Sequence, residues 1–258
     1  LQIKESKIDL AFSQMNNGNV FVGIIIGLIA AYSYNKFSET NLPMALSFFS
    51  GKRLVPIMTA FFCTILAVIL LLIWPPVFNG IVTFGKWIVG MGPFGALLYG
   101  FFNRLLIPTG LHHALNNVFW FDTAGINDIG KFQSGKNAIK GITGRYQAGF
   151  FPVMMFGIPA AALAMYHTAK TNQKKQVYAW FLASSVSAFF VGVTEPIEFA
   201  FMFVAPVLFV IHAVITVLSL FIAAMFQWTA GFSFSAGLID YVLSLVNPIS
   251  NHPWMLLL

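Results

Sequence analysis

A carboxylate lies between two strongly apolar stretches of this chain. Glu195 is part of the run AFFVGVTEPIEFAFMFVAP, and no Lys or Arg occurs from Gln176 to Leu258. Because an ionised carboxylate is costly in hydrocarbon, a membrane protein places one there where it faces a cavity or a partner. Gly192 and Pro196 interrupt a continuous helix around it, and broken backbone at membrane depth is tolerated where it lines a cavity or is buried in protein. The pattern predicts a substrate site at a helix break.

A purely structural role for this segment is the alternative. Proline is favoured at the first helical position, which would make Thr194 or Glu195 a helix N-cap. Glu198 would then lie in the first turn, where a carboxylate stabilises the helix N-terminus without touching a ligand.

A second polar constellation is the sequence NRLLIPTGLHH, in which Pro108 and Gly110 are expected to break the helix. Arg104 offers a rigid fork of donors suited to hydroxyl and carboxylate oxygens, and His112 can exchange a proton near neutral pH. Adjacent residues do not share a helical face, so only one of His112 and His113 is expected to point into a site. The alternative is an interfacial loop in which Arg104 extends toward lipid headgroups.

Three further ionisable residues are weaker candidates. Asp240 is expected to cap or pair locally, His167 to lie at the interface, and His212 to be a buried histidine with its hydrogen bonds satisfied. The sequence has no HExxH motif, no cysteine cluster and no calcium loop, so neither a metal nor a cofactor is expected. It also has no Walker loop, which argues against ATP-driven transport.

The composition indicates a membrane protein. Charged residues make up 9% of the chain and hydrophobic residues 58%, whereas soluble domains carry roughly 25% charged residues. The net charge of +6 comes from short loops, which is a topology signal rather than a nucleic-acid surface. The basic loop KTNQKK and the Lys52–Arg53 pair are therefore expected to be cytoplasmic. The single cysteine, Cys63, excludes an internal disulfide.

Long apolar runs predict several transmembrane helices. The cleanest is Leu54–Trp74, which has no charge and is expected to end at the Pro75-Pro76 pair. The run Ala148–Ala169 contains two prolines and a glycine, so a kink is expected. The run Phe199–Trp228 is longer than one span needs, and it either tilts steeply or breaks at Pro206.

Polar segments separate these runs. Phe121–Gln147 is expected to be a polar loop, and MALSFF to be an interfacial helix. The chain opens with the amphipathic stretch LQIKESKIDL and stops at WMLLL, which predicts a fragment with both ends missing.

Several of these segments resemble a known family. The likeness to the IIC membrane domain of the bacterial sugar phosphotransferase system, glucose superfamily, is carried in order by NRLLIPTGLHHALN, GFFPVMMFGIPAAALAMY, GVTEPIEFAFMF and AGFSFSAGLIDY. It runs through nearly all 258 residues. NRLLIPTGLHHALNNVFWFD is most similar to the N-acetylglucosamine-specific members, because glucose and maltose relatives tend to have PFGLHH where this chain has Thr109.

The resemblance implies an all-α, multi-span helical transporter with re-entrant hairpins, which forms a homodimer in the bacterial cytoplasmic (inner) membrane. Residues 1–92 would be part of the scaffold and dimerisation region, with amphipathic linker helices. Residues 93–258 would be the mobile substrate-binding region, which moves like an elevator. The first scaffold helices and the end of the last helix are expected to be missing.

The resemblance also implies which residues line the sugar site. The family's arginine falls on Arg104, its histidine on His112 and its TEP glutamate on Glu195; Thr194 and His113 are expected beside them. Glu195 is predicted to accept from a hydroxyl near carbon 6, and His112 to orient or deprotonate that hydroxyl. A pairing of Glu195 with Arg104 would lower the cost of placing either charge in the membrane.

The predicted function is that of a sugar permease that moves N-acetylglucosamine, or a related hexose, inward while a phosphocysteine on a partner IIB domain phosphorylates it. The chain would thus be the membrane component of an EC 2.7.1-type phosphotransferase and would not phosphorylate alone. Its other partners would be membrane lipid and a second copy. Three alternatives stay open: a glucose- or maltose-specific member, a proton-coupled secondary sugar transporter, and a non-transporting membrane assembly protein.

Overall fold

The protein is almost entirely helical in its computed structural model, which describes residues 20–121, 125–170 and 174–258. Within those ranges the only β-type pairing is an isolated antiparallel bridge between Thr229 and Asn251. The opening stretch LQIKESKIDL and the middle of the basic loop at 170–175 lie outside the described residues. The expected all-α membrane class is confirmed.

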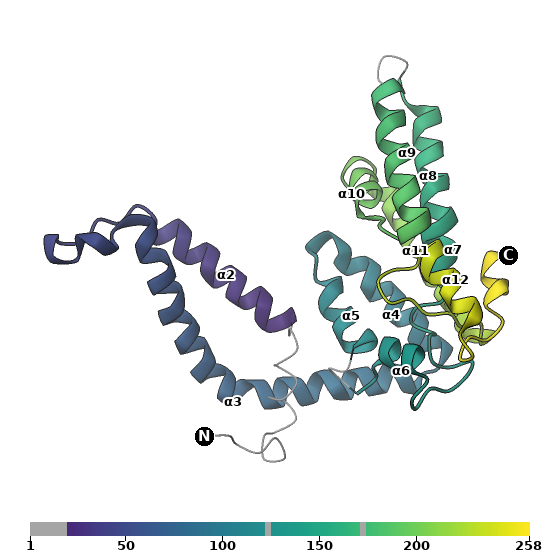
Figure 1. Ribbon diagram of the computed structural model, residues 1–258, viewed down its shortest axis with the longest axis horizontal. Helices are drawn as coiled ribbons and strands as arrows, with labels where there is room; N and C mark the ends of the chain where they lie inside the picture. Colours follow the sequence, from purple (N-terminus) through teal and green to yellow (C-terminus); the bar gives the residue numbers. More distant parts are fainter. Residues whose placement is uncertain (1–19, 122–124, 171–173) are drawn as a thin grey trace. The chain divides into compact units, whose positions relative to one another are not determined.

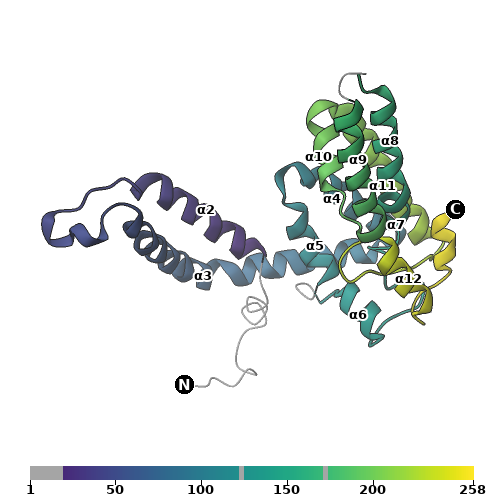
Figure 2. The ribbon, with the colours of Figure 1, turned by 45° about the horizontal axis from the view of Figure 1, so that its top comes forward.

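The chain divides into two compact units, residues 1–83 and 84–258. In the first, α2 (Val20–Phe37) lies beside the first part of α3 (Leu54–Gly90), as Figures 1 and 2 show. The Phe62 ring of α3 packs against two aromatic rings of α2, those of Tyr32 and Phe37. Between these helices are the short 3-10 helices η3 (Met44–Phe49), where an interfacial helix is expected, and η4 (Gly51–Arg53).

The predicted end of the first span at Pro75-Pro76 is wrong. Helix α3 continues through both prolines to Gly90. A proline inside a helix loses one hydrogen bond and crowds the preceding turn, but membrane helices tolerate prolines where neighbouring groups satisfy the freed backbone. Here Trp74 and Phe78 are buried in a small apolar cluster on either side of the prolines.

The second unit contains the remaining elements. These are α4 (Pro93–Leu106), η5 (Ile107–Thr109), α5 (His112–Trp120), α6 (Asp128–Ser134), α7 (Phe150–Pro152), the π-helical turn η7 (Val153–Gly157), α8 (Ile158–Thr168), α9 (Lys174–Val191), α10 (Glu195–Val204), α11 (Pro206–Met225), α12 (Leu238–Val246) and η9 (Pro253–Leu257).

Four helices form the core of this unit. Helix α4 packs extensively on α11, and α8 and α9 form a hairpin whose helices run side by side in Figures 1 and 2. The chain approaches α11 closely at Gly149, where a Cβ would lie 2.4 Å from the Leu220 Cα, so glycine is required there. A hydrophobic core cluster is formed by buried apolar side chains of α8, α9, α10 and α11, including Ile158, Ala188 and Phe201.

Three helical interruptions follow the sequence prediction. The helix before the GLHH sequence ends at Leu106, and Gly110 takes a left-handed conformation ahead of α5. The run from Phe199 breaks between Val204 and Pro206 rather than tilting as one helix. In the run with two prolines and a glycine, the irregularity is the π-helical turn η7.

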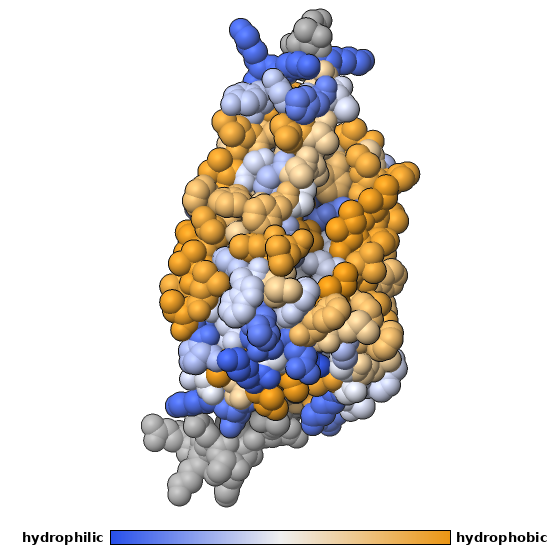
Figure 3. All heavy atoms as spheres, turned by 90° about the vertical axis from the view of Figure 1, so that its right-hand side faces the viewer, coloured by the Kyte–Doolittle hydropathy of each residue, from blue (hydrophilic) through white to orange (hydrophobic). Residues whose placement is uncertain are grey.

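Among the described residues, three helices are long and apolar enough to cross a membrane: 51–90, 150–168 and 206–225. Two shorter apolar helices, 22–37 and 177–191, accompany them. A hydrophobic belt is visible in Figure 3, where apolar side chains lie between hydrophilic ends. Part of the segment expected to be a polar loop is not solvent-exposed, because Asp128, Phe132 and Gln147 are buried.

Candidate functional site

A buried ion pair lies at the centre of the second unit. The Arg104 Nη1 of α4 donates to the Glu198 Oε1 of α10 at 2.7 Å, and the two side chains are 94 positions apart in sequence. The two residues are 2% and 1% exposed. Burying both charges carries a large desolvation cost, which only close geometry and further hydrogen bonds can offset.

A histidine completes the cluster. The His212 Nε2 of α11 lies 3.0 Å from the same carboxylate oxygen, Glu198 Oε1. An ionised carboxylate only accepts hydrogen bonds, so this imidazole nitrogen carries the proton. Thr194 is buried beside Glu198, and its backbone carbonyl accepts from the Glu198 N–H at 3.0 Å. We call Arg104, Glu198 and His212 the central charge cluster.

Local backbone geometry places these three side chains. Glu198 lies in the first turn of α10, close to the helix N-terminus, where a negative charge is favoured. The chain reaches that turn through Gly192, whose φ is +81° and whose added Cβ would lie 2.7 Å from the Ser235 Oγ. Arg104 lies in the last turn of α4, where a cation is favoured, and its guanidinium is 5.0 Å from the Phe150 ring centroid.

Three buried nitrogen atoms have no hydrogen-bond partner within the described ranges. Two belong to Arg104 of the cluster, Nε and Nη2, and the third is Nδ1 of the nearby His112. His112 is close enough to Arg104 and Glu198 to interact electrostatically with both. Buried polar atoms are satisfied in most native structures, so a group of unpaired ones calls for a ligand or water. The unpaired nitrogens are chemically suited to hydrogen-bond with oxygen atoms.

The two adjacent histidines differ as expected. His112 is 9% exposed and His113 is exposed, with ring centroids 4.0 Å apart. Only His112 is therefore buried toward the central charge cluster.

The expected pairing of Arg104 with Glu195 is wrong. Glu195 is half-buried, and its Oε2 accepts from the backbone N–H of Thr194 at 3.1 Å. Glu198, three residues later, lies on the buried face of α10 with Ile197 and Phe201. Sequence reasoning assigned Glu198 only a capping role, although its spacing of three from buried Phe201 was a usable signal.

His212 was also missed as a partner. It is an isolated imidazole in an apolar run, where a satisfied buried histidine was expected. The structure places it partly buried, with its side chain 12% exposed, and its hydrogen bond joins it to the central charge cluster. The residues expected at the site from the second constellation, Arg104 and His112, do lie together.

A second polar network adjoins the cluster on α4 and α5. The hydroxyl of Tyr99 and the amide of Asn103 both donate to Asn116 Oδ1, at 2.7 Å and 2.6 Å. All three residues are buried. They cross-link the two helices that carry Arg104 and His112 and so hold those side chains in place.

The buried carboxylate of Asp128 in α6 takes part in a network that links the segment before α7 to the segment before α12. Asp128 accepts from the backbone N–H of Gly144 at 2.9 Å and from the Gln147 side chain at 2.8 Å. Gln147 in turn accepts from the Phe232 N–H at 2.9 Å. Burial raises the pKa of Asp128, while the hydrogen bonds from Gln147 and Gly144 oppose this rise. These contacts connect the segment before α7 to the segment before α12.

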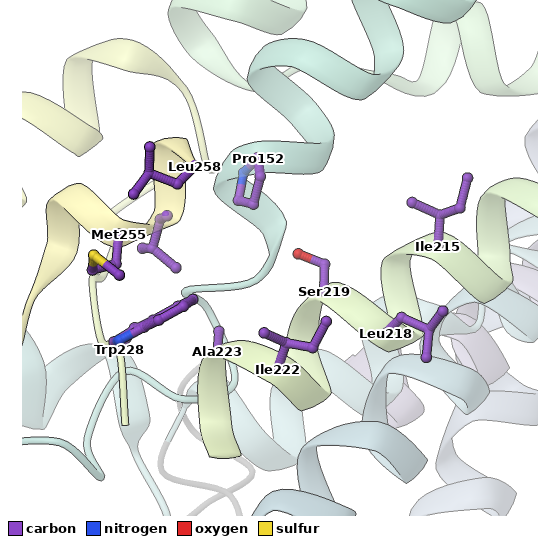
Figure 4. A pocket seen from close by; sticks show the side chains of 10 residues that line it. Pro152, Ile215, Leu218, Ser219, Ile222, Ala223, Trp228, Met255 and Leu258 are labelled. Carbon is purple, nitrogen blue, oxygen red and sulfur yellow. The ribbon is translucent and has the colours of Figure 1, made fainter. Parts of the chain in front are cut away.

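The pocket drawn in Figure 4 is apolar. Its volume is about 310 Å³, and it is lined mostly by aliphatic side chains of α11 and η9 together with Pro152 and Trp228. The hydroxyl of Ser219 in its wall already donates to the Gly149 carbonyl. It offers little to a sugar. Within the described ranges, no three His, Cys, Asp or Glu side chains are grouped to hold a metal.

The fold and this site define a multi-span α-helical membrane protein that encloses ionised side chains at its centre. The chain belongs to the EIIC family of the phosphotransferase system: the family model "Phosphotransferase system, EIIC" matches residues 2–216. Members of this family are bacterial cytoplasmic membrane proteins, and so is this chain.

Curated relatives support the same assignment. The chain is 52% identical to the "PTS system N-acetylglucosamine-specific EIICB component" of Bacillus subtilis over 94% of its length and 53% of that protein. It is 49% identical to the N-acetylglucosamine-specific EIICBA component of Escherichia coli over 93% of its length and 38% of the relative. A glucose-specific EIICBA component of Staphylococcus saprophyticus is 44% identical over 92% of the chain and 37% of the relative. The chain thus spans about half or less of these relatives.

Proposed function

We propose that the chain is the permease part of a phosphotransferase system for N-acetylglucosamine. The observation that carries this proposal is a group of unpaired nitrogens beside the buried Arg104–Glu198 pair: the donors Arg104 Nε and Nη2, and His112 Nδ1, which donates or accepts according to its tautomer. Sugar hydroxyls and an acetamido carbonyl oxygen are neutral acceptors that match these donors. The names of the two most similar relatives above support the N-acetyl sugar over glucose.

In this proposal Glu198 and Glu195 have different tasks. Glu198 neutralises Arg104 and fixes its guanidinium, so that Nε and Nη2 bind sugar oxygen. Glu195 is half-buried and not paired with a cation in the described ranges, so it can turn from the Thr194 N–H to accept from a sugar hydroxyl near carbon 6. Thr194 and His113 are proposed to complete the wall of the sugar site.

Phosphorylation requires a partner. The sugar 6-hydroxyl oxygen would attack the phosphorus of a phosphocysteine on a IIB domain, forming an O–P bond as the S–P bond breaks and the thiolate leaves. The hydroxyl proton would pass to Glu195 or His112. The single cysteine of this chain, Cys63, lies within the spanning helix α3 and cannot replace that partner. A relative named as an EIICB component supports a partner of this type.

The proposed transport movement assigns residues 1–92 to a scaffold that forms a homodimer and residues 93–258 to a mobile substrate-carrying region. All residues of the proposed sugar site lie in the second compact unit, which agrees with a site that moves as a whole.

Binding of radiolabelled N-acetylglucosamine to the purified chain tests the site. In a scintillation proximity assay, Arg104→Gln should weaken binding at least tenfold, since a lost hydrogen bond from a charged group costs about 1.5 to 3 kcal/mol. Arg53→Gln, which changes an exposed arginine of η4 in the same way, is the matched control and should change affinity less than threefold. Unaltered binding by Arg104→Gln would contradict the proposed site. Tighter binding of glucose than of N-acetylglucosamine would contradict the assignment of the sugar.

The transported product separates group translocation from proton-coupled transport. Vesicles that contain the chain, with a phosphorylated IIB protein inside, should accumulate N-acetylglucosamine 6-phosphate. Accumulation of unmodified sugar that depends on a pH gradient would favour the rival instead.

A further inference from the structure

The α8–α9 hairpin carries a groove outside the sugar site. Pro159, Leu163 and Tyr166 of α8 and Tyr178, Leu182 and Ser185 of α9 are among the residues that line it. Its volume is about 280 Å³ and its walls are almost entirely apolar. Leu163, Tyr178 and Leu182 are 57%, 51% and 48% exposed, so the groove opens outward from the hairpin.

Positive charge gathers at one end of this groove. Lys170 and Lys175 are exposed and Lys174 is half-buried where α8 and α9 meet their connecting loop. Figure 3 shows hydrophilic side chains at that end above an apolar band. No Asp or Glu occurs between residues 159 and 185, and none of these lysines forms an ion pair within the described ranges. The charge is therefore available to an anion.

Two tyrosines connect the charged end to the apolar groove. The Lys174 Nζ lies 5.9 Å from the Tyr166 ring centroid, and the Tyr166 and Tyr178 rings are 5.5 Å apart. Tyrosines of this kind are typical of the membrane–water interface. Tyr166 and Pro159 are seven positions apart, so the groove continues for about 10 Å beneath the rings at 1.5 Å per residue. One leaflet of the hydrocarbon core is about 15 Å deep, so a groove of this length fits within a single leaflet.

We propose that this groove binds an anionic phospholipid, with the phosphate of its headgroup against Lys174 and Lys175 and one acyl chain between α8 and α9. An anionic phospholipid of the bilayer carries its phosphate directly next to its acyl chains, just as the lysines lie next to the apolar groove. A soluble acidic protein would satisfy the lysines but would not enter an apolar groove at hydrocarbon depth. Basic sites between transmembrane helices on the cytoplasmic side bind anionic lipid headgroups by the same chemistry.

Native mass spectrometry of the purified chain in detergent tests this site. Dioleoylphosphatidylglycerol and dioleoylphosphatidylcholine, which share acyl chains, are titrated separately. The anionic lipid should bind more tightly to the parent. Lys174→Gln with Lys175→Gln should weaken it roughly 30-fold, from about 1 kcal/mol per lysine and 1.4 kcal/mol per tenfold change. Phosphatidylcholine binding should hardly change.

Two further variants separate the contributions. Lys136→Gln with Lys140→Gln removes two exposed lysines from another loop and should leave the lipid preference intact. Ser185→Phe fills the groove without altering charge and should weaken binding of both lipids. Melting temperatures in the same detergent confirm that each variant is folded.

Three results would overturn the proposal. The first is equal affinity of the parent for both lipids. The second is a preference for phosphatidylglycerol over phosphatidylcholine that persists in the variant with both Lys174→Gln and Lys175→Gln. That result counts against the proposal even if the same variant interacts less well with a soluble IIB protein. The third is displacement of the lipid by inorganic phosphate at equal concentration, because a free anion would then be sufficient without the groove.

Discussion

The difference between Glu198 and Glu195 gives a sharp test of the central charge cluster. Glu198→Gln keeps the size of the side chain and one acceptor oxygen but removes the negative charge that faces Arg104 at 2.7 Å and His212 at 3.0 Å. The guanidinium is then buried without its counter-charge. Removing one partner of a buried ion pair costs about 3 to 5 kcal/mol, and the retained oxygen places this variant near 3 kcal/mol.

The matched control is Glu195→Gln. Its side chain is half-buried and accepts one backbone hydrogen bond that a glutamine oxygen can also accept. Its loss of stability should stay below about 1 kcal/mol. Both variants change the same chemical group, three residues apart on one helix, so any difference comes from the environment of each carboxylate.

Thermal unfolding in detergent measures both effects. For a chain of this size about 1 kcal/mol corresponds to roughly 2 to 4 °C, so Glu198→Gln should lower Tm by about 6 to 12 °C and Glu195→Gln by under 4 °C. Labelled N-acetylglucosamine binding should fall in both, for different reasons: Glu198→Gln releases Arg104, and Glu195→Gln loses a contact to the sugar. Equal Tm values for the two variants would refute the assignment of Glu198 as the structural partner of Arg104.

A double variant strengthens this test. Arg104→Met combined with Glu198→Leu removes both charges and leaves apolar groups of similar size. Replacing a buried pair by apolar residues is often neutral, so the double variant should recover much of the stability lost by either single change, yet bind no sugar. Additive losses would mean that the two side chains do not interact energetically.

Three other predictions follow from the geometry. His112→Ala should weaken sugar binding at least tenfold and His113→Ala by a smaller factor, because only His112 is buried toward the central charge cluster. Asp128→Asn should cost about 1 to 3 kcal/mol, measured by Tm, because its new amide meets the amide that donates to Asp128. The raised pKa of Asp128 means that the folded state retains a proton which the unfolded chain loses, so parental stability should fall as pH rises above about 4, and the asparagine variant should lack that part of the slope. Gly192→Ala should destabilise by about 1 to 3 kcal/mol from φ alone, and by more through the approach to Ser235; an unchanged Tm would contradict this.

The sequence predicted the breaks in the helices well because their causes are local. Pro206 cannot continue the hydrogen bonding of the helix before it, and Gly110 permits a left-handed turn that other residues resist. The Pro75-Pro76 pair follows the same local rule but fails, because α3 continues through both prolines. Helices in membranes tolerate proline where the freed backbone groups find other partners, and the local rule does not include that tolerance.

The site was predicted in composition but not in its pairing. Apolar surroundings correctly indicated that the TEP segment and Arg104 lie in one buried region. Which of two glutamates faces the arginine depends on a rotation of about 300° around α10, and hence on where that helix begins. The sequence could not predict that His212 belongs to the site. Its partner Glu198 lies on another helix, and the spacing of the two residues along the chain does not indicate that they are in contact.

The π-helical turn at 153–157 affects how the protein tolerates changes in length. A π-helical turn accommodates more residues than an α-helical one, so excising a single amino acid there could convert it to regular α-helix without breaking the rod. The side chains on either side of the deletion would then keep their directions, because the wider turn had already absorbed the extra residue. The lysine-tipped hairpin would present the same side to the bilayer as before. Natural relatives that lack one residue in this stretch would therefore be expected to need no compensating changes on the outward faces of the two hairpin helices.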